Sequence, residues 1–222
     1  MKLKIHENQL KTINIMSTKI IIIIALFVAS VVSAQGQFEQ GMGKALQTWK
    51  EGKPAEAVAQ LERIASVEKT NWLPNYYIAL INTTQAFGEQ NKTKMLSLIE
   101  AAQKAQDICN DLAMDHPEVL VMQAMIHTAS IVYDPMTNGQ RLSGDVMYIL
   151  NKAYKIAPEN PRVVLQKADF EIGMAQYFGQ DTKPMCAQIE KSIELFATFK
   201  PESALHPNWG LDRAQEALKG CK

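Results

Sequence analysis

The sequence has no excess of charge and no sustained alternation of apolar and polar residues. Lysine and arginine total 23, and aspartate and glutamate also total 23, so the formal net charge is zero. A neutral chain has no general electrostatic attraction for nucleic acid or for an anionic membrane surface, and we expect neither as a partner. The missing alternation argues against β-sheet, whereas apolar residues recur at helical spacing along most of the chain. We therefore predict an all-α fold.

Long apolar runs are also lacking, apart from one near the N-terminus that has the form of an export signal. Residues 20–32 form a run of 13 mainly apolar residues, preceded by lysine and followed by a small-residue cleavage site that ends at Ala34. At about 1.5 Å per residue the run would span roughly 20 Å, less than the roughly 30 Å core of a bilayer. We expect residues 1–34 to be a signal peptide with an upstream extension at 1–15, so that membrane attachment would require an uncleaved signal. The mature protein, residues 35–222, is expected in the periplasm or outside the cell.

Cysteine is scarce and its number is odd. Cys109 falls within a helical pattern, where it is best explained as a small buried apolar residue. Cys186 lies near the start of one expected helix and Cys221 lies beyond the end of the next. If these helices are antiparallel neighbours, the two sulfurs lie at the same end of the pair. A disulfide between Cys186 and Cys221 is therefore a hypothesis for an exported protein.

The sequence lacks the common motifs of catalysis and metal binding. It has no glycine-rich phosphate loop, no GxSxG turn and no pair of histidines at metal-binding spacing. The histidines, His6, His116, His127 and His206, stand apart from one another. We therefore expect no catalytic residue, no metal and no cofactor, and an enzyme with an unrecognised site is the least favoured of three interpretations.

Self-similarity along the chain is the strongest structural signal. Pro117, Pro161 and Pro207 each follow a polar residue and have alanine seven residues later. Proline suits the first turn of a helix because its missing N–H is not needed there, and alanine permits close packing against a neighbouring helix. Looser matches at Phe38 and Trp72 extend the series, and the five positions are 34, 45, 44 and 46 residues apart. Each interval fits a pair of helices.

The first unit also carries a recognisable motif. It has the 34-residue period, Trp49-Lys50-Glu51-Gly52 before its turn, and Ala57 at the small position of its second helix. In these features the chain resembles the tetratricopeptide-repeat (TPR) superfamily, although the later units are longer and lack the Trp, Leu-Gly and Tyr signature. The sequences YDPM at 133–136, NPR at 160–162, FKPE at 199–202 and LHPNWG at 205–210 also resemble those of secreted repeat proteins from Bacteroidetes-type bacteria.

The resemblance implies a TPR-like α-solenoid of about four helical hairpins plus a C-terminal capping helix, which we expect from Pro207 to Leu218. In such a solenoid the first helices of successive units line one concave surface. The candidate groove residues on these helices are Tyr76, Leu80, Thr83, Arg162 and Gln166. Packing between helices is the competing explanation for Tyr76 and Leu80.

The third unit contains a long polar stretch between its two expected helices. Residues 134–145 are rich in polar residues and glycine, and we predict a surface loop there with Asp134, Asn138 and Arg141 as candidate contact residues. The overall prediction is an exported interaction module that binds a protein or peptide partner. A structural subunit of a cell-envelope assembly, making its contacts through the outer helical faces, is the alternative.

Overall fold

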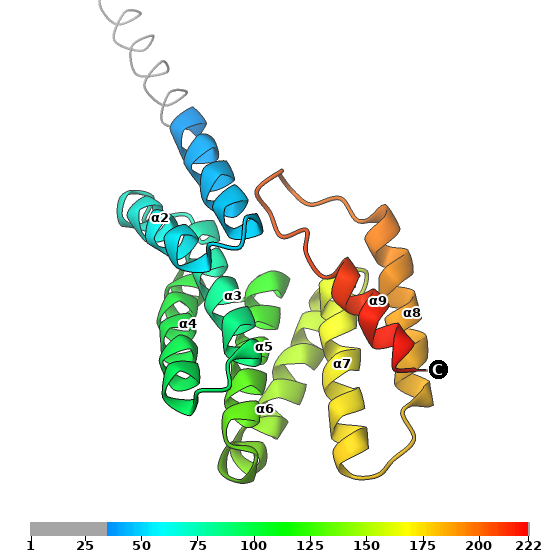
Figure 1. The fold of residues 1–222 in the computed structure, drawn as a ribbon. Coiled ribbons are helices and arrows are strands. Elements are labelled where there is room, and N and C mark those ends of the chain that lie inside the picture. The colour runs from blue at the N-terminus through cyan, green and yellow to red at the C-terminus, as the bar shows by residue number, and fades with distance from the viewer. Residues whose placement is uncertain (1–34, 222) are drawn as a thin grey trace, which may run out of the picture.

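The computed structural model describes residues 35–221, which form helices joined by short turns and one longer crossing segment (Figure 1). The helices are the N-terminal helix (residues 35–50), α2 (Pro54–Val67), α3 (Leu73–Gly88), α4 (Lys92–Ala113), α5 (Pro117–Tyr133), α6 (Pro135–Ile156), α7 (Pro161–Tyr177), α8 (Lys183–Thr198) and α9 (Leu211–Lys219). No strand occurs between residues 35 and 221, and the all-α prediction is confirmed. The predicted signal peptide, residues 1–34, lies outside the described residues.

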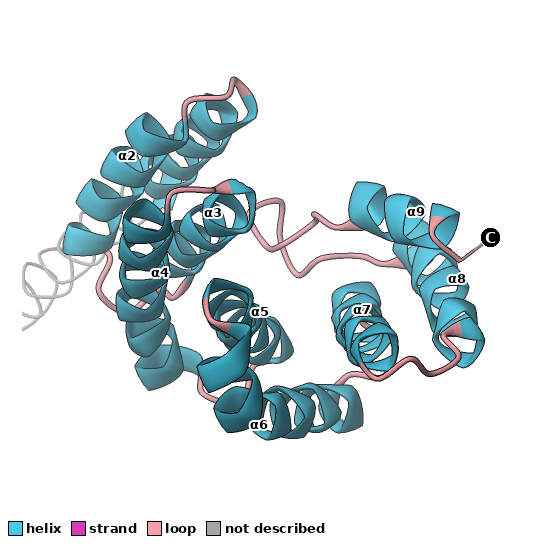
Figure 2. Cartoon of the chain, turned by 60° about the horizontal axis from the view of Figure 1, so that its bottom comes forward, coloured by secondary structure: helices cyan, strands magenta, loops and turns pink. Residues whose placement is uncertain are grey.

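Consecutive helices pair into four stacked hairpins, as the repeat spacing predicts. The N-terminal helix pairs with α2, where the Gln60 amide donates to the Thr48 hydroxyl over 3.3 Å. The next pairs are α3 with α4, α5 with α6 and α7 with α8, and α9 packs on α8. Figure 2 shows α3, α5 and α7 as an inner layer and α4, α6 and α8 as an outer layer. The first helices of successive units therefore face a common side.

Local sequence signals explain where most helices begin. Asn91, His116 and Asn160 each precede a helix and accept a hydrogen bond from a backbone N–H of its first turn. Pro117 and Pro161 occupy the first turns of α5 and α7, so these two anchors of the repeat mark helix starts. Both signals act within three residues, which is why the sequence alone identifies them.

The polar stretch at residues 134–145 is helical, and the prediction of a surface loop is wrong. Asp134 accepts a hydrogen bond from a backbone N–H three residues on (3.1 Å), and α6 begins at the following proline. Leu142 and Val146 are buried and continue the apolar stripe of α6 towards its C-terminus. Asn138 and Arg141 lie on this helix and bond to each other, Arg141 Nη2 donating to Asn138 Oδ1 over 3.1 Å. Asp134 therefore caps α6 at its N-terminus, and Asn138 and Arg141 lie on the helix itself.

The third proline anchor of the repeat, Pro207, does not start a helix. Pro207 belongs to a non-helical segment, residues 199–210, which joins α8 to α9 and which we call the strap. The strap crosses to the N-terminal end of α3 and returns (Figure 1), and the Tyr77 hydroxyl donates to the Leu205 carbonyl over 2.9 Å. Gly210 has a φ of 111°, a left-handed conformation that favours glycine, and α9 starts directly after it. The capping helix therefore runs from Leu211, and not from Pro207.

The C-terminal end is tied down covalently. The structure joins Cys186, in the first turn of α8, to Cys221, just beyond α9, through a disulfide with a Cα–Cα distance of 5.7 Å. The remaining cysteine, Cys109, is buried in the main core, and this burial raises the pKa of its thiol to about 12. A thiol with so high a pKa is unreactive at neutral pH.

Among the described helices, none combines the length and apolarity that crossing a membrane would require.

Candidate functional site

The concave side of the solenoid carries a groove of about 580 Å³, formed by residues from every hairpin. Trp49 comes from the N-terminal helix, Leu80, Thr84 and Phe87 from α3, Ala124, Met125 and Thr128 from α5, Leu150 from α6, Gln166, Asp169 and Phe170 from α7, Trp209 and Gly210 from the strap, and Asp212 and Arg213 from α9. Its volume lies within the range of small-molecule sites, roughly 300–1,000 Å³. We therefore treat this groove as the candidate site.

The groove is lined mainly by aromatic and aliphatic side chains. Rings come from Trp49, Phe87, Phe170 and Trp209, and Met125 adds a thioether. The hydroxyls of the two lining threonines donate to carbonyls within their own helices, over 2.9 and 2.8 Å, so they offer the groove little free polarity. The described lining residues include no histidine, cysteine, tyrosine or lysine. Such a surface suits a flat, apolar molecule better than a chain of polar groups.

Polar character is concentrated at the edge where α7 meets α9. The guanidinium of Arg213 donates to the carboxylate of Asp169, with Nε to Oδ2 at 3.0 Å and Nη2 to Oδ1 at 2.8 Å. The Asp169 side chain is 20% exposed and that of Arg213 is 55% exposed. Asp212 is exposed in the first turn of α9, where the helix dipole favours a negative charge. This edge is the one place in the described lining that offers a charged hydrogen-bond donor.

The structure brings two of the predicted groove residues to the groove. Leu80 and Gln166 line it, although Leu80 is also almost fully buried. Tyr76, Thr83 and Arg162 are buried at 0–1% exposure and do not line it. The Thr83 hydroxyl donates to a carbonyl of its own helix over 2.8 Å. These three side chains are packed in the interior, so the prediction that they line the groove is wrong.

Several lining residues were not singled out from the sequence. Phe87 and Phe170 lie on expected helices, and their apolar character and helical spacing were the signals that could have selected them. Trp209 lies on the strap, whose path across the molecule depends on distant contacts. No local pattern indicates that Trp209 and Arg213 face the same cavity as Trp49.

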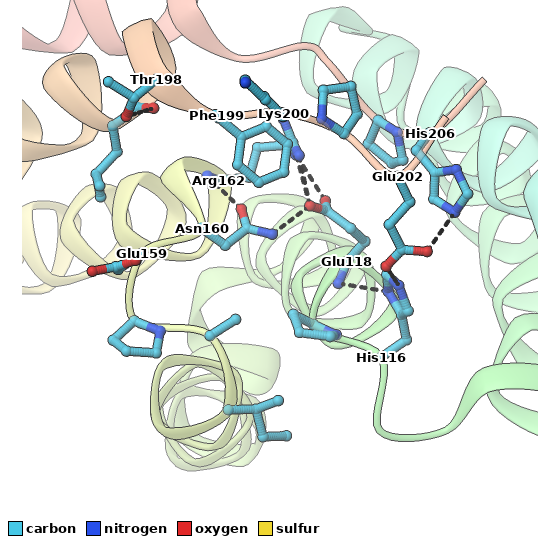
Figure 3. A pocket seen from close by; sticks show the side chains of 17 residues that line it. His116, Glu118, Glu159, Asn160, Arg162, Thr198, Phe199, Lys200, Glu202 and His206 are labelled. Atoms are coloured by element: carbon cyan, nitrogen blue, oxygen red, sulfur yellow. Dashed lines mark hydrogen bonds and ion pairs between the residues drawn. The ribbon is translucent and has the colours of Figure 1, made fainter. Parts of the chain in front are cut away.

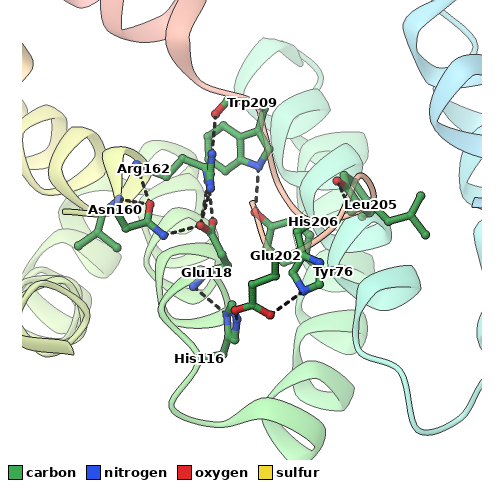
Figure 4. Close-up of polar contacts among 11 residues, drawn as sticks. Tyr76, His116, Glu118, Asn160, Arg162, Glu202, Leu205, His206 and Trp209 are labelled. Carbon is green, nitrogen blue, oxygen red and sulfur yellow. Dashed lines mark hydrogen bonds and ion pairs between the residues drawn. The ribbon is translucent and has the colours of Figure 1, made fainter. Parts of the chain in front are cut away.

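A polar network holds the strap against the helices (Figure 4). The Trp209 indole N–H donates to the Tyr76 hydroxyl over 2.9 Å, and the Trp209 carbonyl accepts from Arg162 over 3.4 Å. Burial, with the nearby Glu118 charge, raises the pKa of Tyr76 well above its usual value, so its hydroxyl stays neutral. Burial likewise raises the pKa of Tyr77, whose hydroxyl donates to the strap. Hydrogen bonds to α3 and α7 therefore fix the position of the strap, and with it the part of the groove that Trp209 lines.

A second cavity, also about 580 Å³, lies where the strap passes the N-terminal ends of α5 and α7 (Figure 3). Glu202 of the strap faces two histidines there, at 3.7 Å from His116 Nε2 and 3.2 Å from His206 Nε2. His116 Nδ1 accepts from the backbone N–H of Glu118 over 3.2 Å, so the proton of the neutral ring is on Nε2. Desolvation lowers the pKa of His116, against the opposing effect of the two glutamates.

The histidine arrangement fits a polar contact of the strap better than a metal site. A protonated Nε2 offers no lone pair to a cation. Across residues 35–221 no group of three or more histidine, cysteine, aspartate or glutamate side chains is placed to hold a metal ion. We interpret this second cavity as the seam between the strap and the solenoid.

Comparison with known proteins gives similarity at the level of structure. No family model matches the chain, and none of the curated proteins matches it. The HusA haemophore from Porphyromonas gingivalis superposes with a TM-score of 0.73 at 25% identity, covering 83% of this chain and 92% of that one. A thermophilic TPR protein of Thermus thermophilus superposes with a TM-score of 0.55 at 10% identity, over 83% of this chain and 98% of that one. The predicted TPR-like helical-repeat fold, and the resemblance to repeat proteins of Bacteroidetes, are confirmed.

Proposed function

We propose that this TPR-like helical-repeat protein is an exported carrier that holds a flat, largely apolar molecule of the porphyrin class, such as haem, in its concave groove. The observation that carries the proposal is the groove itself, with aromatic side chains converging from two helices of the inner layer, the N-terminal helix and the strap. The structural similarity to a haemophore, at 25% identity over most of both chains, supports the same cargo class. The proposed activity is binding, and no catalytic step forms part of it.

The groove would hold a porphyrin through apolar contacts with the two faces of the ring, and its described lining residues provide no strong ligand for the iron. Aromatic and aliphatic walls remove the ring faces from water, which is favourable by roughly 25 cal/mol per Å² of apolar surface. Among the described lining residues Met125 is the one sulfur donor, and no histidine lines the groove. We therefore expect haem and the metal-free ring to bind with similar affinity.

Spectroscopic titration tests this proposal directly. Adding haem to the mature protein, residues 35–222, should give a saturable shift of the Soret band and quench the fluorescence of Trp49 and Trp209, which line the groove. If neither haem nor metal-free porphyrin binds saturably, the proposal is overturned.

Two matched variants locate the site. Phe87 lines the groove and is 41% exposed, so Phe87→Ser should weaken porphyrin binding about tenfold, equal to roughly 1.4 kcal/mol, without unfolding the protein. Phe178 is more exposed, at 61%, and lies outside the groove, so Phe178→Ser is the control and should leave the affinity unchanged. Equal effects of the two variants would place the ligand elsewhere.

Export is part of the proposal and rests on the apolar run of residues 20–32 and the cleavage site at Ala34. A disulfide between Cys186 and Cys221 suits an oxidising compartment and supports the same conclusion. Expression from the full-length gene, followed by N-terminal sequencing of the protein from the periplasm or medium, should give Gln35 as the first residue. A mature chain that still begins ahead of residue 20 would contradict cleavage.

A protein or peptide partner is the second candidate, and one surface feature favours it. Tyr177 and Phe178 at the α7–α8 turn are 74% and 61% exposed and stack edge to face, with ring centroids 5.1 Å apart. Met136 at the start of α6 is 75% exposed, and Figure 1 shows both turns at the same edge of the solenoid. Exposed apolar side chains that lie close together are typical of contact surfaces. A subunit of an envelope assembly would need such a surface.

Binding assays separate this candidate from the groove. The double variant Tyr177→Ser/Phe178→Ser should lose a protein captured from envelope extracts by the wild type while binding haem normally. Retention of every captured protein by the double variant would argue against a contact at this turn.

A further inference from the structure

We propose that Arg213 recognises a carboxylate of the cargo and thereby selects flat apolar molecules that carry a free acid at their edge. This inference rests on the proposed function of the groove and specifies the chemical class of its ligand. Arg213 is the one cationic side chain among the described residues that form the groove.

The hydrogen bonds of Arg213 to protein groups involve Nε and Nη2 and leave Nη1 available. Nε and Nη2 both donate to Asp169, at distances of 2.8–3.0 Å, and they occupy one edge of the planar group. A guanidinium has five N–H donors, and within residues 35–221 the two on Nη1 have no protein acceptor. The side chain is 55% exposed, so this second edge is open to an incoming group. Arginine binds carboxylates in a planar, often two-pronged geometry, which suits such an edge.

The aspartate partner fixes the arginine before a ligand arrives. Asp169 lies on α7, and its carboxylate is only 20% exposed, whereas Arg213 projects from α9. An unpaired arginine would lose side-chain entropy on binding, and the existing pair reduces that loss. The affinity that a ligand acid can gain is limited, because Asp169 and the neighbouring lining residue Asp212 both repel a second carboxylate.

The groove separates this acid contact from its apolar interior. Phe170 follows Asp169 in the chain, and Trp209 and Gly210 lie just ahead of α9, so the aromatic wall continues directly into the charged edge. A molecule with an apolar body and an acidic margin can contact the aromatic wall and the guanidinium of Arg213 at once. A fully esterified molecule of the same shape can contact the wall but has no carboxylate for the arginine.

The test compares protoporphyrin IX with its dimethyl ester, which has the same ring but no ionised acid. Wild-type protein should bind the free acid about tenfold more tightly than the ester, measured by porphyrin and tryptophan fluorescence at low ionic strength. Arg213→Gln should remove this preference by weakening the free acid alone, while the ester keeps its wild-type affinity. Arg141→Gln, an exposed arginine outside the groove, is the matched control and should retain the full preference.

The outcomes distinguish this inference from the proposed function on which it rests. Equal affinity of the wild type for acid and ester would overturn acid recognition and leave the groove as a porphyrin site. Equal weakening of both ligands by Arg213→Gln would show that the arginine only supports the wall, which also overturns the inference. If neither porphyrin binds the wild type, the proposed function itself fails.

Discussion

The guanidinium of Arg162 is paired with the carboxylate of Glu118, 44 residues earlier, and the two side chains are 1% and 4% exposed. Nε and Nη2 of Arg162 both donate to Glu118, over 2.7–2.9 Å, and Asn160 donates to the same carboxylate over 2.6 Å. The ring of Phe199, at the start of the strap, covers the guanidinium with its centroid 4.7 Å away. The pair therefore links the first turns of α5 and α7 beneath the strap.

Breaking this buried pair on one side should be strongly destabilising. Arg162→Met leaves the Glu118 charge buried without its partner, and we expect a loss of about 3–5 kcal/mol in the free energy of unfolding. The double variant Glu118→Leu/Arg162→Met removes both charges and should recover most of that loss. Urea denaturation of the wild type, the single variants Arg162→Met and Glu118→Leu, and the double variant measures the coupling between the two side chains. A double variant as unstable as Arg162→Met would contradict the prediction.

Loosening the strap should change both stability and ligand exchange. Tyr77→Phe removes the hydroxyl that donates to Leu205 without altering a lining residue, and we expect it to cost about 1 kcal/mol. Because Trp209 of the strap forms part of the groove wall, porphyrin dissociation should also become faster. Tyr154→Phe, on α6 and outside the groove, is the control for stopped-flow measurements. Identical dissociation rates in both variants would show that the strap does not limit exchange.

The disulfide should contribute substantially to stability. It closes a loop with a sequence separation of 35, for which chain entropy predicts roughly 3 to 4 kcal/mol. Cys221→Ser should lower the thermal midpoint by the same amount as reducing the wild type, and reductant should have no further effect on the variant. Thiol titration of the denatured, unreduced wild type should find one free thiol, Cys109. Three free thiols would contradict the bond.

The helical state of the 134–145 region can be tested with glycine. Gly144 lies inside α6 on the exposed surface, and a Cβ built on it meets nothing within 4 Å. In a helix, Gly144→Ala should therefore stabilise the protein by about 0.5–1 kcal/mol. Gly52 has a φ of 78°, so Gly52→Ala is the contrasting change and should destabilise. A neutral or unfavourable Gly144→Ala would point back to a loop.

Two partly buried histidines predict a loss of stability in mild acid. Desolvation lowers the pKa of both His116 and His127, so the unfolded chain binds protons more readily than the folded one. The free energy of unfolding is therefore unaffected by these histidines above about pH 6.5, the ordinary histidine pKa. It decreases as the pH falls from there towards the lower pKa values that the two histidines have in the folded protein. Denaturation curves at several pH values should show this slope. It should flatten in His116→Asn, which retains a capping side chain, combined with His127→Gln.

The sequence predicts the hairpins well because their signals are local. Pro117 and Pro161 start helices in the structure, and the apolar stripes that follow need only the 3.6-residue period to be recognised. The same reasoning failed at Pro207, where an identical polar-proline pair lies in the strap. It also failed at residues 134–145, because the polar residues and glycines there hid a capped helix whose buried stripe starts only at Leu142.

By itself, then, the sequence determined an all-α chain, the spacing of its helix pairs and most helix starts, since capping and periodicity act within a few residues. Tertiary structure decided the path of the strap and the composition of the groove. The hydrogen bonds that position Trp209 on Tyr76 and Leu205 on Tyr77 join residues 133 and 128 positions apart. Such contacts depend on how complete hairpins stack, because buried polar groups must find partners that the stacking brings near. No local pattern in the chain encodes that pairing.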